Sequence, residues 1–156
     1  MEGAPPNLDL IRRIYELGRR YLEGDREPLD AAVADLFSPD VEVVLSSALA
    51  SGTVGPYRGH DGIRRWMADI GQTWDQFETR DEHWLEVPPN KVVVLGTIVA
   101  GRPAQHGYAV EVGWIWTISD GRVVAMHSYE TYARALDEAG VPEEIRKSLS
   151  GAPEDP

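Results

Sequence analysis

The segment EVGWIWTISDGRVVAMHSYETY, residues 111–132, places two stretches of alternating apolar residues on either side of an Asp-Gly pair. Asp120 and Gly121 suit the backbone of a tight turn, so the pattern predicts a β-hairpin. Because successive side chains of a strand point to opposite faces, Trp114 and Trp116 share one face of the first strand. Two indoles on one face of a sheet require either a packed core or an apolar pocket behind them.

Strand-like patterns fill the second half of the chain, with short connections that predict antiparallel neighbours. The predicted strands there are residues 83–87, 91–100, 108–119 and 122–130, and VEVVL at residues 41–45 predicts an earlier strand. Helical patterns come mostly before these strands. This order predicts an α+β fold, in which the helices lie across one face of a curved antiparallel sheet.

Apolar residues at helical spacing predict three helices before the sheet and one after it. The first and second are residues 7–22 and residues 29–37, which follow Pro28 and end before Pro39. The third is capped by Asp61, and its apolar face carries Ile63, Trp66, Met67, Ile70, Trp74 and Phe77. The last is residues 132–140, with a further turn or two in PEEIRKSL. We expect one domain over residues 1–145 and a disordered tail over residues 146–156.

Charge and composition limit the classes of partner. The formal net charge of -11 disfavours attraction to nucleic acid or to an anionic membrane surface. The chain has no cysteine, which removes thiolate catalysis and thiolate metal sites. The start MEGAPPNLDL has neither a basic region nor an apolar run, and no stretch has the length and apolarity of a membrane span. We therefore expect a cytoplasmic protein without a membrane or nucleic-acid partner.

The pieces GDREPLDAAVADLFSPDVEVV, YRGHDGIRRWM and ISDGRVVAMHSYETYARALDEAG, in this order, resemble the SnoaL-like branch of the nuclear transport factor 2-like superfamily, which includes ketosteroid isomerases. The resemblance extends from about Leu8 to Gly140. It implies a cone in which three to four helices and a bent sheet enclose an apolar cavity, and a homodimer formed through the outer face of the sheet. It is specific for the fold and weak for the function, because the superfamily contains enzymes of several kinds as well as binding proteins.

The resemblance gives the two tryptophans a place on the wall of the cone. The residues expected to bind a small hydrophobic ligand are Trp114, Trp116, Tyr57, Trp66, Met67, Trp74, Met126, Val112 and Leu45. The same residue types also fill packed cores, so an open pocket and a cone filled by tryptophans both remain. On the outer face, Glu111, Gly113, Ile115, His127 and Tyr129 form the expected dimer surface.

Carried over residue by residue, the catalytic groups of the superfamily are missing. The base and the tyrosine of ketosteroid isomerases align with Leu45 and Leu17, and Tyr15 and Tyr21 lie on different helix faces. The histidine and aspartate of the SnoaL-type polyketide cyclases align with Trp114 and Ser128. Both departures leave it open whether this chain is an enzyme, either a cyclase-like lyase or an isomerase.

Two groups remain as candidate catalytic residues. Alternation along the last strand places Ser128 and Glu130 on the cavity face. A carboxyl held against indoles would titrate near neutral pH and could move a proton, although Glu130 also fits a solvated rim position or a partner for Arg64, Arg65 or Arg134. Ser128 fits an orienting group better than a nucleophile. No histidine pair has metal-binding spacing, so we expect neither a metal nor a cofactor.

Two functions therefore stay open. One is proton-transfer chemistry on a small hydrophobic molecule, such as cyclisation, isomerisation, dehydration or hydrolysis. The other is binding without catalysis, either of a small ligand inside the cone or of a partner on the outer sheet.

Overall fold

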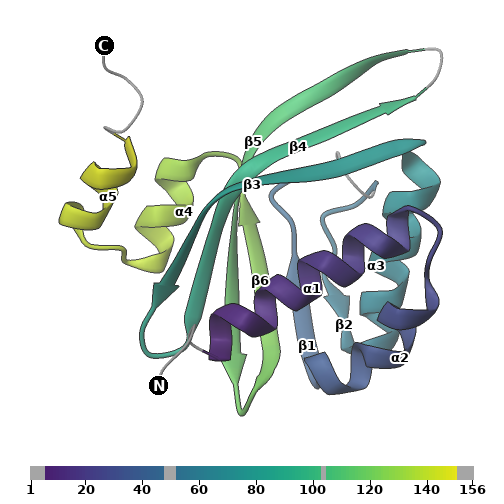
Figure 1. Ribbon diagram of the computed structural model, residues 1–156, viewed down its shortest axis with the longest axis horizontal. Coiled ribbons are helices and arrows are strands. Elements are labelled where there is room, and N and C mark those ends of the chain that lie inside the picture. Colours follow the sequence, from purple (N-terminus) through teal and green to yellow (C-terminus); the bar gives the residue numbers. More distant parts are fainter. Residues whose placement is uncertain (1–5, 48–51, 103–104, 151–156) are drawn as a thin grey trace.

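The computed structural model describes residues 6–47, 52–102 and 105–150 (Figure 1). Within them the helices are α1 (Pro6–Leu22), α2 (Glu27–Leu36), α3 (Gly59–Thr73), α4 (Tyr132–Ala139) and α5 (Glu143–Ser150). The strands are β1 (Phe37–Val44), β2 (Tyr57–Arg58), β3 (Gln76–Val87), β4 (Lys91–Arg102), β5 (Gln105–Ser119) and β6 (Arg122–Tyr129). The predicted α+β class is confirmed.

The six strands form one bent, mixed sheet in the order β2-β1-β6-β5-β4-β3. All neighbours are antiparallel except β1 and β6, which pair in parallel. The hairpin β5–β6 forms as predicted, with Trp114 opposite Ser128 and with Asp120 and Gly121 at positive φ in its turn. β2 has only two residues, and the sequence did not predict it as a strand.

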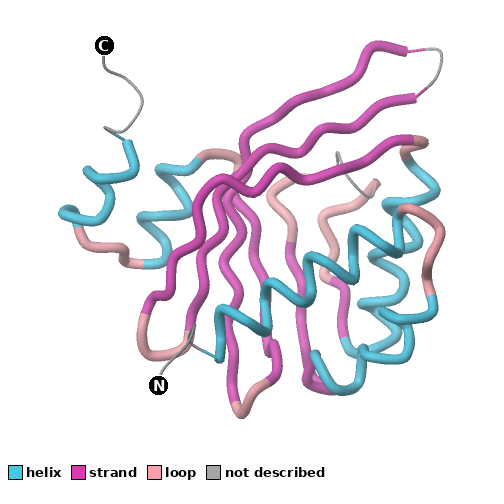
Figure 2. Tube along the Cα trace, viewed as in Figure 1, coloured by secondary structure: helices cyan, strands magenta, loops and turns pink. Residues whose placement is uncertain are grey.

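The helices α1, α2 and α3 cover the concave face of the sheet, whereas α4 and α5 lie on its other side (Figures 1 and 2). The first helix buries Ile11, Ile14, Leu17 and Tyr21, which follow one another at three- and four-residue steps. Helix α4 follows the last strand of the sheet. Thr131 caps its N-terminus, and Gly140, whose φ of 73° is left-handed, caps its C-terminus.

Three sequence predictions about the helices need correction. The second helix ends at Leu36, because Phe37 already adopts the extended backbone of β1. The third begins at Gly59 with Arg58 at its cap position, so Asp61 lies in its first turn and does not cap it. It ends at Thr73, because Trp74 is extended and Phe77 pairs with Ala100 in the sheet.

The C-terminal segment is more ordered than the sequence suggested. The further turns expected in PEEIRKSL form helix α5, whose residues 146–150 fall within the segment that was expected to be a disordered tail. Residues 151–156 lie outside the described part of the chain.

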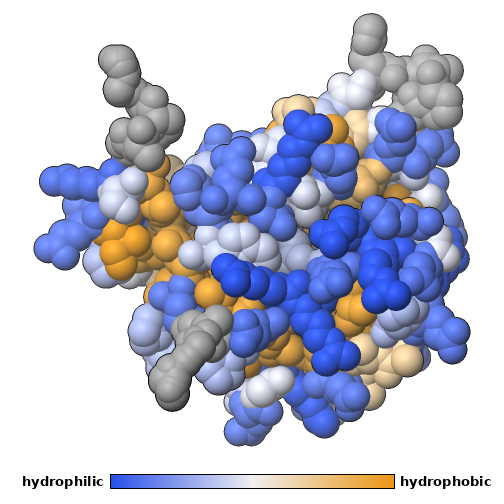
Figure 3. Space-filling view, in the orientation of Figure 1, coloured by the Kyte–Doolittle hydropathy of each residue, from blue (hydrophilic) through white to orange (hydrophobic). Residues whose placement is uncertain are grey.

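Apolar side chains form two buried clusters, one on each side of the sheet. The larger lies inside the cone and includes Trp114, Trp116 and Met126. The smaller lies between the sheet and α4, where Val93, Leu95 and Ile115 meet Ala135, Leu136 and Val141. Figure 3 shows apolar side chains at the surface beside α4 and α5, on an otherwise largely hydrophilic face. None of the described helices is long and apolar enough to span a membrane.

The outer face of the sheet is therefore not the open surface that the sequence analysis expected. Ile115 is 5% exposed in the cluster beneath α4. A Cβ at Gly113 would come within 2.4 Å of the Cβ of Ala135, so glycine is needed for the helix to approach. Of the expected dimer surface, His127 is exposed and Tyr129 is half-buried.

Candidate functional site

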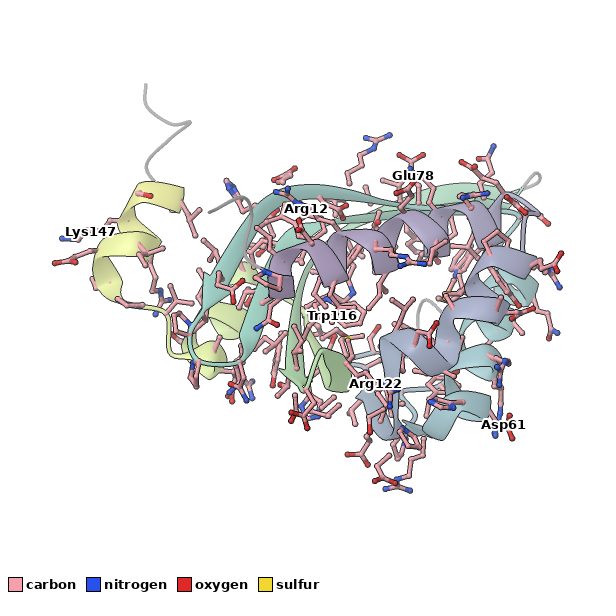
Figure 4. All side chains as sticks on the ribbon, turned by 60° about the horizontal axis from the view of Figure 1, so that its bottom comes forward. Arg12, Asp61, Glu78, Trp116, Arg122 and Lys147 are labelled. Atoms are coloured by element: carbon pink, nitrogen blue, oxygen red, sulfur yellow. The ribbon has the colours of Figure 1, made fainter. Side chains whose placement is uncertain are left out.

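An open cavity of about 620 Å³ lies inside the cone, between helices α1 and α3 and the concave face of the sheet. Figure 4 shows Trp116 in the space beneath α1, whereas Asp61 and Lys147 point away from it. Eight of the residues predicted for the site line this cavity: Trp114, Trp116, Trp66, Met67, Val112, Leu45, Ser128 and Glu130. The cone is thus not filled by its tryptophans.

Three residues predicted to bind the ligand do not line the cavity. The Tyr57 hydroxyl donates a hydrogen bond of 2.7 Å to Oδ2 of Asp69, and its ring is buried. Trp74 lies just past the end of α3 and packs edge-on against Tyr108. Met126 is fully buried in the core. Their apolar character was read correctly, but it serves packing rather than the cavity wall.

Tyr15 is the centre of the aromatic wall. Its ring centroid lies 5.1 Å from that of Trp84, 5.5 Å from that of Trp114 and 5.6 Å from that of Trp116, each in an edge-to-face arrangement. Edge-to-face pairs at these distances fix the orientation of a ring beyond simple burial. The phenol is therefore held in one position on the cavity wall.

The Tyr15 hydroxyl is poised to donate a hydrogen bond into the cavity. Nε1 of Trp116 donates to this oxygen at 3.2 Å, which leaves the phenolic proton for another acceptor. Burial raises the pKa of Tyr15 well above its ordinary value, against the smaller lowering by the Trp116 hydrogen bond. The group stays neutral and remains a donor at physiological pH.

Asp81 supplies a carboxyl group to the same region. Its pKa is raised, first by burial; a side-chain hydrogen bond with Thr79 and the charge of Arg19 act in the opposite direction. Its carboxyl also raises the pKa of Tyr15, so the two groups interact electrostatically. The residue has substantial accessible surface because it borders an open cavity, while the surrounding protein still disfavours its charged form.

A β-bulge in strand β3 directs Asp81 into the cavity. Asp81 pairs with Gly96 and His83 pairs with Leu95, so Glu82 is an extra residue on β3. The cavity side carries Phe77, Thr79 and Asp81 before the bulge, and Trp84, which packs on Tyr15, after it. Because strand side chains alternate, one extra residue is needed for Asp81 and Trp84 to share a face.

Gly96 makes room for this bulge. A Cβ at that position would lie 2.3 Å from the carbonyl oxygen of Arg80, a backbone atom that cannot move aside easily. A glycine inside a strand often marks a bulge or a close backbone approach. The glycine that interrupts VVVLGTIVA is thus the sequence signal for the bulge that positions Asp81.

Ser128 and Glu130 lie across the sheet from Asp81. Ser128 is 8% exposed, and its Oγ accepts a 3.0 Å hydrogen bond from the backbone N–H of Ser46. The Oγ atoms of Ser46 and Ser128 are 3.4 Å apart. Glu130 follows β6 directly, is exposed and lines the cavity. Three strand spacings separate β6 from β3, which is on the order of 14 Å, so these residues form a second polar end.

Tyr15 and Asp81, the two polar residues that matter most for the chemistry of the site, were not identified from the sequence. Tyr15 was noticed only as a tyrosine on a different helix face from Tyr21; the structure indeed buries Tyr21 in the core and places Tyr15 at the cavity. Asp81 was not considered, because the strand was expected to begin at residue 83. Among the described residues, no group of three or more histidine, cysteine, aspartate or glutamate side chains could hold a metal ion.

Comparison with solved structures gives similar folds at low sequence identity. An NTF2-like protein of unknown function from Burkholderia pseudomallei is 18% identical, with 86% of this chain and 97% of that chain covered and a TM-score of 0.66. A putative SnoaL-like polyketide cyclase from Jannaschia sp. CCS1 is 15% identical, with coverages of 91% and 99% and a TM-score of 0.64.

A third structure, a hypothetical protein with a ketosteroid isomerase-like fold from Catenulispora acidiphila in complex with trimethylamine, is 14% identical. It covers 84% of this chain and 96% of that chain, with a TM-score of 0.60. These likenesses show the nuclear transport factor 2-like fold.

The sequence itself decides the family. No curated protein matches the chain. The model of the SnoaL-like domain matches residues 18–126, which is more than half of the chain and includes α3, most of the sheet and the cavity residues from Gly18 to Trp116. The chain therefore belongs to the SnoaL-like domain family.

Proposed function

We propose that the cavity binds a small, mostly apolar molecule that carries a carbonyl group, and that Tyr15 and Asp81 move a proton on that molecule. The observation that carries this proposal is that a neutral phenol and a carboxyl of raised pKa, which interact electrostatically, both line one open aromatic cavity. Groups with shifted pKa values in an apolar cavity are typical of acid–base sites.

The chemistry follows from what a neutral phenol and a carboxyl group can each do for a bound carbonyl compound. The Tyr15 hydroxyl donates a hydrogen bond to the carbonyl oxygen, and the Asp81 carboxylate takes a proton from the adjacent carbon. The electron pair of the broken C–H bond moves to the oxygen, where the phenol stabilises the enolate. Return of the proton from Asp81 to a carbon completes the cycle. Isomerisation, dehydration and aldol-type cyclisation all begin with this step.

Ser128 and Glu130 keep a role in this proposal at the far end of the cavity. Ser128 has a hydroxyl fixed by the Ser46 N–H and can orient a second polar group of the ligand. Glu130 remains a prediction as an acid or base at the cavity mouth. Replacing Glu130 with glutamine tests it, because loss of turnover in a folded variant would transfer the role of base from Asp81 to Glu130.

Deuterium exchange tests the proposed chemistry without knowledge of the natural substrate. The two-ring ketone 2-tetralone is incubated with the protein in D₂O, and loss of the signal of its protons next to the carbonyl is followed by proton NMR. We expect faster exchange than in buffer alone, abolished by Asp81→Asn. The control Asp61→Asn removes a carboxylate that is 98% exposed in its ion pair with Arg64 and points away from the cavity. Equal exchange in both variants would refute the assignment of Asp81.

A non-catalytic ligand-binding protein is the second candidate. It is favoured by the absence of the superfamily's catalytic pairs, since Trp114 and Ser128 stand at the histidine and aspartate positions of the cyclases. The same experiment separates the two functions. Saturable binding of 2-tetralone, followed by tryptophan fluorescence, together with exchange no faster than in buffer would support the binding protein.

A further inference from the structure

We propose that Tyr132, on the outer helix α4, is a positioning residue for Asp81, because its hydrogen bond to Glu82 holds the β3 bulge from outside the cone. The inference rests on the proposed function, in which Asp81 is the proton-transfer group. It adds a residue that does not touch the cavity and comes from an element on the opposite side of the sheet (Figure 1).

The contacts between α4 and the bulge are direct. The Tyr132 hydroxyl donates a 2.8 Å hydrogen bond to Oε1 of Glu82, the extra residue of the bulge. The Tyr132 ring packs edge-on against His83, with centroids 6.2 Å apart. One side chain thus contacts both the extra residue of the bulge and the residue that follows it, and Asp81 immediately precedes them.

The backbone of Tyr132 fixes where this side chain stands. Its N–H donates a 2.5 Å hydrogen bond to Oε2 of Glu111 on β5. Thr131 caps the helix by accepting a 3.1 Å hydrogen bond from the N–H of Arg134, and Ala135 packs against Gly113. Helix α4 is therefore anchored to β5 while its first residue reaches to β3, two strands away.

A bulge needs such an anchor because its register can slip. Moving the extra residue by one position along β3 would turn Asp81 from the concave face to the outer face. Gly96 permits the bulge without holding it, since glycine contributes no side-chain contact. The Tyr132–Glu82 hydrogen bond favours the register in which Glu82 and His83 face α4 and Asp81 faces the cavity.

The charged and titratable groups around the Asp81 carboxyl come from the cavity side. Tyr15 and Arg19 face it from α1, and Thr79 bonds with it from β3 itself. None of them touches Tyr132 in the contacts described above. Glu82 and Glu111, the two carboxylates that Tyr132 contacts, keep their charges when only the Tyr132 hydroxyl is removed. A change in the titration of Asp81 in that variant therefore reports the geometry of the bulge.

Carboxyl ¹³C NMR of the full chain, in which the Asp81 signal is assigned by Asp81→Asn, reads this coupling without any substrate. In Tyr132→Phe the bulge loses its donor, and every charge near Asp81 is kept. We expect the titration midpoint of Asp81 to fall toward that of an ordinary aspartate, because a loosened bulge lets the carboxyl leave its partly desolvated position beside Tyr15 for fuller contact with water. Thr131→Ala is the matched control: it weakens α4 through loss of its cap and leaves the Tyr132 hydroxyl in place.

A pair of variants at Glu82 tests the acceptor. Both Glu82→Gln and Glu82→Ala remove the same negative charge, but glutamine keeps an oxygen that accepts from Tyr132. We expect a lower midpoint in Glu82→Ala than in Glu82→Gln. An unchanged midpoint in Tyr132→Phe, an equal change in Thr131→Ala, or equal midpoints in the two Glu82 variants would each overturn the inference. Failure of the proposed function would appear separately, as deuterium exchange that Asp81→Asn leaves intact.

Discussion

The Tyr15 side chain has two roles: its ring packs among the indoles, and its hydroxyl can donate a hydrogen bond to a ligand. Three indoles fix its ring, and a fourth contact, from the Trp116 N–H, occupies one lone pair of its oxygen. A phenol held in this way loses little entropy when it donates to a ligand, which is the condition for stabilising a developing oxyanion.

Replacing Tyr15 with phenylalanine should therefore lower the rate of deuterium exchange into 2-tetralone by about 10²–10³-fold, the usual effect of removing one oxyanion donor. The fold should persist, because the ring and its aromatic contacts remain. Circular dichroism provides the control for folding. Exchange at the wild-type rate would show that the phenol plays no part.

The raised pKa of Asp81 predicts how the stability of the protein depends on pH. Its pKa is raised in the folded protein, so the folded state binds more protons than the unfolded state between the ordinary aspartate pKa and the folded value. Ionisation of Asp81 therefore destabilises the folded protein. The free energy of unfolding falls as the pH rises from the ordinary aspartate pKa to the higher pKa of the folded state. Asp81→Asn should be more stable than the wild type above the folded pKa, and this difference should vanish at pH values below the ordinary aspartate pKa. Thermal unfolding from pH 3 to pH 8 measures this difference. A difference independent of pH would contradict a raised pKa of Asp81 in the folded protein.

The sequence predicted which types of residue line the cavity better than it predicted which positions along the chain do so. Eight of the residues named for the site line the cavity, because aromatic and apolar alternation along β5 reports which face is inward. Tyr57, Trp74 and Met126 have the same character and do not, because the alternation says nothing about how far along the cone the cavity extends. Asp81 could not be predicted as a cavity residue, because the bulge that turns it toward the cavity was not predicted from the sequence.

Among the elements, β3 departs most from expectation. The pattern HWLEV predicted a short strand, yet the sheet continues back to Gln76 through a stretch rich in charged residues. Pairing with the apolar strand β4 along its whole length stabilises this stretch more than its own composition does. The same pairing takes Phe77 from the predicted third helix.

The close approach of Gly96 to strand β3 predicts that a side chain at this position destabilises the protein. A methyl group there would collide with the carbonyl oxygen of Arg80, so Gly96→Ala must displace the backbone of β3. We expect a loss of about 1–3 kcal/mol in the free energy of unfolding, the usual range for overpacking. The variant should also lose exchange activity in the molecules that remain folded. Urea denaturation measures the first effect, and a stability equal to that of the wild type would show that the bulge is not formed as described.

For the whole molecule, the question left open by the sequence was whether the cone is filled. The structure describes a cavity of about 620 Å³, within the usual size of small-molecule sites. Alternation and spacing could identify the inward faces but could not give their separation, which depends on how α1 and α3 are held over the bent sheet.

The oligomeric state depends on which surfaces of the folded protein are open to a second copy. We propose a homodimer, and any interface must include surfaces beyond the expected outer-sheet set, because α4 covers Gly113 and Ile115. The partly buried apolar residues Leu85, Val87 and Leu149 beside α4 and α5 offer such a surface. Sedimentation equilibrium at micromolar concentration should give twice the 17.3 kDa mass of the chain. A single species at the monomer mass would remove the proposal.

The most direct test of the account is a titration of ¹⁵N-labelled protein with 2-tetralone, followed through the five indole N–H signals. We predict saturable shifts for Trp66, Trp114 and Trp116, which line the cavity, and much smaller shifts for Trp74, which does not. Shifts confined to Trp74, or none at millimolar ketone, would contradict an open cavity that binds small apolar molecules.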